Sequence, residues 1–556
     1  MMTEEEKAIA VRRNRVVVLI LFCFVVLIGL RIMNIQSQSP EYDEIWTVRH
    51  YVNIPVSRIL SDVATPNNHV LNSLGIKFFS AWVPNLVFAM RLPALLGFAG
   101  LFILLLRGVL KLFRGKTARG CVMAAVLLDG MILHYAETAR GYSLQTFFVF
   151  GLLLALLCFN SEGGKNRRFN AVMWLLCASG CCLSVSSGVI FVSILSGLWV
   201  LLYMPFREGV ARLWKDYRSL LFAGLIWSVF VLVWYGGNYS QFAEGRANFG
   251  ESFTSLGQYF RYCGDILWST GLLWPLLVLA AGIVWLRRDE SVRIVWLCGS
   301  AVLLVLISAM FTKGGPPRVY LPLIPVAVFG AGAVLDEFLF RYEKVRKIGL
   351  VFFLAVVAAS AYFSESRRIA AADPDMGTVF SEVRKIDPAV LTVYRPTDLY
   401  VVLNLFGKDA SADNVNRLQN PSMLMLLHDN QIGTMRFSDS ATGSVPPGCA
   451  AVDSGFADPA RKMPYWLYRL RPLQPGENLS GKAVLCIVHG VVPELQKENR
   501  ENWLKNSFAV VNGFLAAGSS RFCFAADGSK LTADKLLFLE QSRPGRVFFR
   551  IVTGQQ

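Results

Sequence analysis

Two adjacent carboxylates, Asp43 and Glu44, follow the first long apolar run of the chain. Charged side chains are costly beside the hydrocarbon of a membrane, so that such a pair commonly marks a functional site. A carboxylate in a partly desolvated cleft can accept a proton as a general base. We therefore predict that Asp43 and Glu44 are catalytic, with Asp43 as the base that activates a hydroxyl group. The alternative interpretation is that both are solvated or cap the helix that follows.

A histidine and a lysine come next in the chain. Residues Pro66, Asn67 and Asn68 favour a turn that leads into His69. At this loop-to-helix junction His69 could donate a hydrogen bond to an anion or bind a metal ion, and Lys77 falls two helical turns later on nearly the same face. We predict that His69 and Lys77 bind a phosphate and that Asn68 lines the substrate pocket. A structural histidine and a lysine that extends to the membrane interface are the alternatives.

Two arginines lie at the outer ends of apolar runs, on the same predicted side of the membrane as the acidic pair. Arg140 is in a very short turn between two runs, and Arg318 follows a Gly-Gly-Pro-Pro sequence at the start of another. The planar guanidinium group suits phosphate, so we predict that both arginines bind one. The neighbours expected in the substrate pocket are Glu137, Tyr142 and Tyr320. An ion pair of Glu137 with Arg140 that merely joins two helix ends is the alternative.

The composition indicates a membrane protein. The chain has 556 residues, of which 54% are hydrophobic and 17% are charged, with a mean hydropathy of +0.45. Charged residues make up about a quarter of an ordinary soluble domain, and apolar runs near 20 residues recur here. The formal net charge of +16 does not predict a nucleic-acid partner, because much of the excess lies in short loops between apolar runs.

We predict about eleven transmembrane helices in an α-helical, polytopic domain. The first covers about 16–35; a signal peptide is the weaker alternative, because the run is long, lacks a clear cleavage site and precedes further spans. The others are expected at about 91–112, 119–135, 142–160, 169–185, 187–204, 219–236, 267–286, 293–311, 319–340 and 347–364.

The basic residues give the orientation. Loops expected in the cytoplasm carry five, three, four, three and four Lys or Arg residues, whereas the outer loops after them carry one, none, two and two. This alternation follows the positive-inside rule and puts the predicted site and the C-terminal part on the outer side of the membrane. The orientation of the C-terminal part depends on the pair 169–185 and 187–204. If these two runs were one broken span, residues 366–556 would lie on the opposite side of the membrane.

The chain is expected to have two domains. Residues 1–365 form the transmembrane domain, with interfacial helices in a first outer loop at 36–90 and a polar, aromatic second outer loop at 237–266 suited to a mobile cover. Residues 366–556 have the composition of a soluble α/β domain. Its strand-like runs are 389–394, 465–470, 483–489 and 546–552, and its helix-like runs are 379–385, 399–406 and 493–506.

Together these segments resemble the integral-membrane glycosyltransferases of the GT-C class, in particular the bacterial group related to protein O-mannosyltransferases and the lipid A aminoarabinose transferase. The resemblance covers about residues 10–365. Asp43-Glu44 matches the acidic motif of the first outer loop, and Asn67-Asn68-His69-Val70 matches an Asn-His-Pro turn with Val in place of Pro. Two further motifs are matched in part by Tyr135…Glu137…Arg140…Tyr142 and by Arg318-Val319-Tyr320.

The resemblance implies transfer of a sugar from a polyprenyl-phosphate donor to a lipid, glycan or protein acceptor. It also implies that the membrane is the bacterial cytoplasmic (inner) membrane and that the site and the C-terminal domain face the periplasm. The phosphate is already a good leaving group, so the cations would stabilise its growing charge while Asp43 activates the acceptor in an inverting displacement. Some relatives use a divalent metal ion, and Glu44, His69 and Glu137 are its candidate ligands here. No other cofactor is expected.

Two other functions stay open. A flippase or transporter of lipid-linked sugars would typically place charges within its spans and repeat its halves, whereas most ionisable clusters here lie at outer span ends. An O-antigen ligase or polymerase would usually carry its key residues in a large late outer loop, whereas here the first outer loop carries them.

Overall fold

In the computed structural model the chain divides into two compact units. The first unit comprises Met1–Gln38 and Thr47–Ala372, and the second comprises Ser39–Trp46 and Asp373–Gln556. The structure describes residues 42–52, 54–63, 68–161, 166–204, 210–243, 252–286, 289–312 and 314–342, the positions 25, 28, 29 and 32, and seven strands of the C-terminal part. The predicted span at 347–364, nearly all of the one at 16–35, Pro66, Asn67 and the predicted C-terminal helices lie outside these residues.

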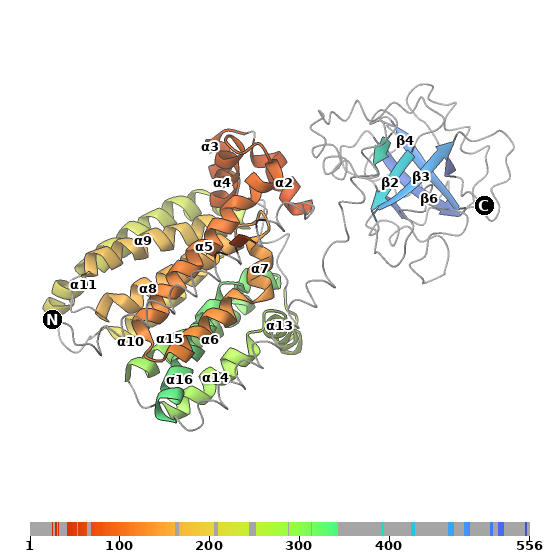
Figure 1. Ribbon diagram of the computed structural model, residues 1–556. Helices are drawn as coiled ribbons and strands as arrows, with labels where there is room; N and C mark the ends of the chain where they lie inside the picture. The colour runs from red at the N-terminus through yellow and green to blue at the C-terminus, as the bar shows by residue number, and fades with distance from the viewer. Residues whose placement is uncertain are drawn as a thin grey trace. The chain divides into compact units, whose positions relative to one another are not determined.

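Three short helices form in the segment predicted as the first outer loop. They are α2 (Tyr42–Tyr51), α3 (Val56–Ser61) and α4 (Val70–Ser80). In α4, Val70, Asn72, Ser73 and Ile76 are buried, whereas Phe78 is 60% exposed. The position of these helices in the membrane interface stays a prediction. In Figure 1, α3 and α4 lie at one end of the helical bundle, above the start of the long helix α5.

The helices that follow are mostly long and apolar, as predicted for a membrane domain. Among the described residues, five are long and apolar enough to cross a membrane: α5 (Leu86–Leu112), α8 (Tyr142–Ser161), α11 (Val210–Val231) with its π-helical end η2 (Leu232–Gly236), α15 (Asp289–Thr312) and α16 (Leu323–Arg341). Two bent pairs raise this number to seven if each is one span: α6 (Lys116–Leu127) with α7 (Gly130–Ala136), bent by 57°, and α13 (Leu256–Ser269) with α14 (Leu273–Trp285), bent by 99°.

The decisive pair of predicted spans forms two separate helices. They are α9 (Arg167–Ser184) and α10 (Gly188–Tyr203), which pack against each other. Neither is among the five helices above, and α10 is a shorter apolar helix of 16 residues. Every predicted span between 91 and 340 is thus helical over most of its length, and the crossing of the membrane by eleven helices stays a prediction.

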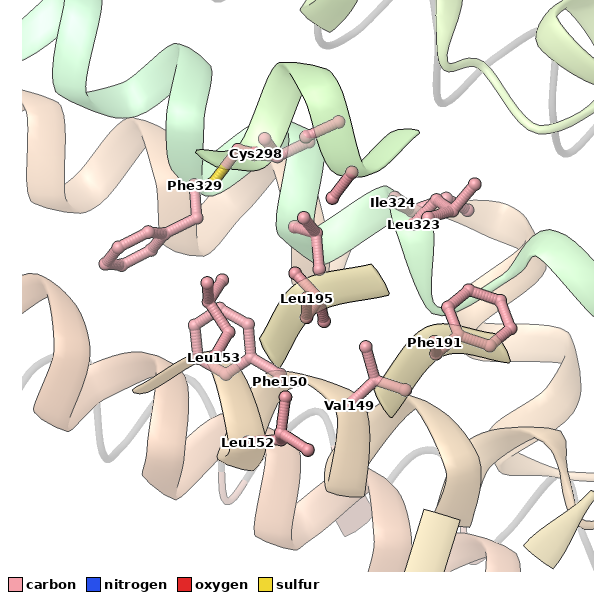
Figure 2. Close-up of a cluster of buried hydrophobic side chains, with 14 of the residues drawn as sticks. Val149, Phe150, Leu152, Leu153, Phe191, Leu195, Cys298, Leu323, Ile324 and Phe329 are labelled. Atoms are coloured by element: carbon pink, nitrogen blue, oxygen red, sulfur yellow. The ribbon is translucent and has the colours of Figure 1, made fainter. Parts of the chain in front are cut away.

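The core of the helical unit forms where α8, α10, α15 and α16 meet. Figure 2 shows their side chains pointing into one cluster. Its labelled members are Val149, Phe150, Leu152 and Leu153 of α8, Phe191 and Leu195 of α10, Cys298 of α15, and Leu323, Ile324 and Phe329 of α16. This packing fixes α8 against α16, and the first residue of α8 and the turn that precedes α16 carry predicted site residues.

The described part of the second unit consists of strands. They are β1 (Leu391–Val393), β2 (Leu424–His428), β3 (Tyr465–Arg471), β4 (Ala483–His489), β5 (Asn512–Phe514), β6 (Arg521–Asp527) and β7 (Ile551–Val552). One sheet has the order β1-β2-β3-β7 and the other β4-β6-β5, and all pairs except the parallel β1 and β2 are antiparallel. Each of the four predicted strand runs contains one strand, whereas β2, β5 and β6 were not predicted.

We expect opposite effects from adding a methyl group at two helical glycines. A Cβ on Gly332 of α16 would collide with the side chain of Val122 and lie 2.9 Å from Phe113 Cε2, whereas a Cβ on Gly197 of α10 would meet nothing within 4 Å. Gly332→Ala should therefore lower the free energy of unfolding by about 1–3 kcal/mol. Gly197→Ala should leave it unchanged or raise it by up to about 1 kcal/mol.

The measurement is the melting midpoint of the two purified variants in detergent, compared with that of the wild type. Equal midpoints for both variants would contradict the close approach of α16 and α6 at Gly332.

Candidate functional site

The ring of Tyr142, at the first residue of α8, is the point at which the predicted cationic segments meet. Tyr142 is 5% exposed. The His69 ring lies edge-on to it, with ring centroids 5.0 Å apart, and the Cζ atom of Arg140 lies 5.8 Å from its centroid. The Nε–H of Arg318 donates a hydrogen bond of 3.2 Å to the Tyr142 hydroxyl. The structure therefore brings together four of the predicted site residues from three distant parts of the sequence.

The turn that carries Arg140 depends on a glycine. Arg140 and Glu137, 3% and 1% exposed, lie in the short segment between α7 and α8. A Cβ on Gly141 would collide with the carbonyl oxygen of Ser184 and lie 2.7 Å from Cβ of His69. The missing side chain at Gly141 lets the end of α9 and the start of α4 approach the turn, so that the imidazole comes close to Tyr142.

His69 is buried in surroundings that favour the neutral imidazole. It precedes α4, is 2% exposed, and forms a hydrogen bond with the backbone of Ser184, whereas its Nε2 atom has no hydrogen-bond partner among the described residues. Burial lowers the imidazole pKa well below 6.5, the cations Arg140 and Arg318 lower it further, and the Ser184 hydrogen bond raises it in part. Because both arginines lower the pKa of the same imidazole, the positive potential of both reaches His69. Without a bound anion, these surroundings favour the neutral imidazole over a third cation.

Asn68 fixes the backbone in front of His69. Its amide Nδ2 donates to the carbonyl oxygen of Ile59 at 2.8 Å and to that of Asp62, and its Oδ1 accepts from the Ser73 hydroxyl at 3.0 Å. Asn68 and His69 also line a cavity of about 30 Å³, enough for about one water molecule. The described bonds of Asn68 are thus structural, and its predicted contact with substrate stays a prediction.

Asn72 is a residue of this region that the sequence did not single out. It is fully buried, and its Nδ2 donates to the carbonyl oxygen of Ala139 at 3.0 Å. This bond joins α4 to the turn that carries Arg140. An asparagine on the buried face of an amphipathic helix was the only available signal.

Two further predicted site residues, Tyr320 and Lys77, form hydrogen bonds with residues other than Tyr142, His69, Arg140 and Arg318. The Tyr320 hydroxyl lies 2.7 Å from the Tyr262 hydroxyl of α13, next to the short 3₁₀ turn η3 (Pro317–Tyr320) that contains Arg318. The Lys77 amine donates to the carbonyl oxygen of Val52 at 2.8 Å. This bond ties α4 to the end of α2, and a phosphate contact of Lys77 stays a prediction.

The acidic pair begins α2. Glu44 is fully buried and Asp43 is half-buried, both within the first turn of the helix. Both belong to the segment Ser39–Trp46, which is grouped with the second compact unit. The approach of Asp43 to Arg140 and Arg318 therefore stays a prediction.

The predicted metal ligands do not form a cluster in the part of the chain that the structure describes. No group of three or more His, Cys, Asp or Glu side chains that could hold a metal ion occurs there. Glu44, His69 and Glu137 thus make no such group, and the metal dependence of the chain stays a prediction.

Arg91 is a buried cation at the first residue of the span predicted at 91–112, where no functional role was predicted for it. It lies in α5 and is 1% exposed. Its neighbours Met90 and Ala94 contact the region of the site: Met90 packs with Ala139, and the Ala94 carbonyl accepts from the Ser143 hydroxyl at 2.8 Å. Because a charged side chain within an apolar run is costly in a membrane, the sequence position of Arg91 already indicated a candidate functional residue.

Comparison with known proteins finds structural neighbours. No protein-family model matches the chain, and no curated protein matches it either. A crystal structure of ArnT from Cupriavidus metallidurans bound to undecaprenyl phosphate covers 75% of this chain and 93% of its own, with 13% identity and a TM-score of 0.49. The apo ArnT structure covers 94% and 99%, with 13% identity and a TM-score of 0.47. A cryo-EM structure of the mycobacterial arabinofuranosyltransferase AftD covers 66% and 30%, with 15% identity and a TM-score of 0.37.

These neighbours, ArnT and an arabinofuranosyltransferase, are proteins of the GT-C class that the sequence resembles. With TM-scores below 0.5, these neighbours carry no argument about the donor, the acceptor or the reaction of this chain. Those questions depend on its own residues.

A pH-dependent loss of stability should report the neutral state of His69. The unfolded chain protonates His69 near pH 6.5, whereas the folded chain does so only at lower pH. Because the unfolded state binds more protons in this window, the free energy of unfolding falls as the pH is lowered from 6.5 toward the folded pKa. His69→Gln removes this contribution. The difference in melting midpoint between wild type and variant should therefore be constant above about pH 7.5 and change below pH 6.5.

His50→Gln, which replaces an exposed histidine of α2, is the matched control. A difference between wild type and His69→Gln that is constant at all pH values would contradict the described surroundings of His69.

Proposed function

We propose that the chain is a membrane glycosyltransferase that transfers a sugar from a polyprenyl-phosphate donor to a lipid, glycan or protein acceptor at the outer face of the cytoplasmic membrane. The observation that carries this proposal is the meeting of Arg140 and Arg318 on Tyr142. Two guanidinium groups from distant segments, beside a neutral imidazole, make a site that favours an anion.

A phosphate is the anion that best fits such a site. Guanidinium groups match phosphate oxygens in geometry and form charge-assisted hydrogen bonds that are roughly twice as strong as neutral ones. The hydrogen bond from Arg318 to Tyr142 and the ring contact of Arg140 orient both groups before a ligand arrives. Such preorganisation is the form in which a protein stabilises developing charge most effectively.

The proposed reaction is a single in-line displacement. The Asp43 carboxylate accepts the proton of the acceptor hydroxyl while the hydroxyl oxygen forms a bond to the anomeric carbon. The bond from this carbon to the phosphate oxygen breaks, and its electron pair leaves with the polyprenyl phosphate beside Arg140 and Arg318. The anomeric configuration is thereby inverted.

Four other predicted residues also have roles in this proposal. Glu44 is the second carboxylate of the catalytic turn, and Lys77 is a further phosphate ligand. The substrate pocket includes Glu137 and Tyr320 together with Tyr142.

Replacement of the proposed base should slow transfer strongly without loss of donor binding. We expect Asp43→Asn to lower kcat by about 10²–10⁴-fold, because the acceptor hydroxyl loses its base. Asp62→Asn is the matched control: Asp62 lies in the same outer loop, and its Oδ2 accepts from the Tyr51 hydroxyl at 3.0 Å, a bond that an amide oxygen can also accept. The assay follows radiolabelled sugar from polyprenyl-phosphate donors into membrane extracts.

Equal transfer by Asp43→Asn and wild type would remove Asp43 from the role of base. Movement of an intact lipid-linked sugar across vesicles containing the purified protein, without cleavage of the sugar-phosphate bond, would favour a flippase instead.

The two site arginines should be needed for the donor phosphate. We expect Arg140→Ala and Arg318→Ala each to weaken binding of polyprenyl phosphate by about 10–100-fold, since a hydrogen bond to a charged group contributes about 1.5–3 kcal/mol. Arg58→Ala, in the exposed position of α3, is the control and should bind as the wild type does. The measurement is equilibrium binding of labelled polyprenyl phosphate to the purified protein. Wild-type affinity in both site variants would contradict the proposed function.

A further inference from the structure

The turn that carries Arg318 is held by a pair of hydrogen-bonded tyrosines. Tyr262 of α13 is 8% exposed, and its hydroxyl donates to the carbonyl oxygen of Gly315 at 2.6 Å. The Tyr262 and Tyr320 hydroxyls lie 2.7 Å apart. Because the single proton of Tyr262 is used for Gly315, Tyr320 is the donor in this second bond. One tyrosine therefore binds the chain on both sides of Arg318.

The glycines before Arg318 have a specific use in this arrangement. A Cβ on Gly314 would lie 2.7 Å from Tyr262 Cζ and 2.8 Å from Phe253 Cζ. The bare backbone at Gly314 thus lets the two aromatic rings, whose centroids are 4.9 Å apart, lie against the main chain. On its own the Gly-Gly sequence indicates only an irregular loop. In the structure, Gly314 leaves the space in which the Tyr262 ring packs against the main chain.

The turn at residues 316–320 can form few hydrogen bonds within itself. Pro316 and Pro317 have no backbone N–H group to donate, and a 3₁₀ helix as short as η3 has poor internal hydrogen-bond geometry. Its bonds include those from Val319 N to Pro316 O at 2.9 Å and from Leu321 N to Arg318 O at 3.3 Å. The direction in which Arg318 leaves the main chain therefore depends strongly on contacts with other segments.

We propose that Tyr262 is a positioning residue for the donor phosphate: by binding Gly315 and Tyr320 it holds the turn so that the Arg318 guanidinium stays aligned on Tyr142. This inference rests on the proposed function of Arg318 as a phosphate ligand. It adds a residue from the second outer loop to a site otherwise built from the first outer loop and the two arginine turns.

The helix α13 provides a matched control for the experiment. Tyr259, one turn before Tyr262, is also buried, and its hydroxyl donates to the carbonyl oxygen of Leu306 at 3.0 Å. Tyr259→Phe and Tyr262→Phe thus each remove one buried hydroxyl that donates to a main-chain carbonyl. Tyr262→Phe also removes the acceptor of the Tyr320 hydroxyl, so it should lower the melting midpoint more than Tyr259→Phe does. Only Tyr262→Phe should disturb Arg318.

The test measures the binding of labelled polyprenyl phosphate to the full-length purified variants, together with KM and kcat for transfer. We expect Tyr262→Phe to weaken donor binding about tenfold and to raise the donor KM in parallel, because a small displacement of a positioning group has large effects. Tyr259→Phe should stay within about twofold of the wild type. In the background of Arg318→Ala, Tyr262→Phe should cause no further loss, because it acts through that arginine.

Several results would overturn the inference. One is a Tyr262→Phe variant that binds donor as Tyr259→Phe does, while Arg318→Ala binds weakly; the proposed function then stands. Another is an undiminished effect of Tyr262→Phe in the Arg318→Ala background. Wild-type binding by Arg318→Ala would instead refute the proposed role of Arg318, and this inference with it.

A second variant covers the case in which Tyr262→Phe does not fold. Gly314→Ala places a methyl group against the Tyr262 ring and should displace it from the turn. We expect the same tenfold weakening of donor binding, and wild-type binding by a folded Gly314→Ala variant would overturn the inference.

Discussion

The meeting of two like charges on one tyrosine is the constraint on which the rest of the site depends. Arg318 donates to the hydroxyl of Tyr142, 176 residues earlier, and Arg140 lies over the face of the same ring. Two cations in partly buried surroundings repel each other more strongly than in water, so their positions require a rigid frame. The packing of α8 against α16 and α5 provides this frame, because Tyr142 begins α8 and the Arg318 turn leads into α16.

Several helices and turns near the site are joined by side chains that donate to main-chain carbonyls. Asn72 binds Ala139, Lys77 binds Val52, and Tyr262 binds Gly315. Carbonyl groups in turns have no partners from regular secondary structure and must be satisfied in another way when they are buried. The same bonds that satisfy these carbonyls also fix the turns that carry the site residues, so the stability of this end of the molecule and the geometry of the site have a common origin.

The sequence predicted that Arg140, Tyr142 and Arg318 belong to one site, and the structure brings these three residues together. They were predictable because two arginines and a tyrosine at the ends of apolar runs are residue types that suit a phosphate site. Tyr262 was not, because its partner Gly315 is 53 residues away and hydropathy carries no pairing information. The continuous span expected at 119–135 is two helices bent by 57°, with Asp129 accepting from the N–H groups of Met131 and Ile132 as the cap of the second. Because aspartate is a preferred N-cap residue, Asp129 inside the apolar run indicated that a second helix begins there.

The neutral state of His69 bears on the charge that the site can match. Under the proposed function the donor is a phosphodiester with one negative charge, and the departing polyprenyl phosphate is a monoester whose charge approaches two, since its second pKa is about 6. Arg140 and Arg318 supply two positive charges, and His69 adds none because burial and both arginines lower its pKa. The two charges therefore match the leaving group better than the bound donor. Binding that strengthens as the bond breaks lowers the barrier, whereas an additional cation would also hold the donor and the product more tightly.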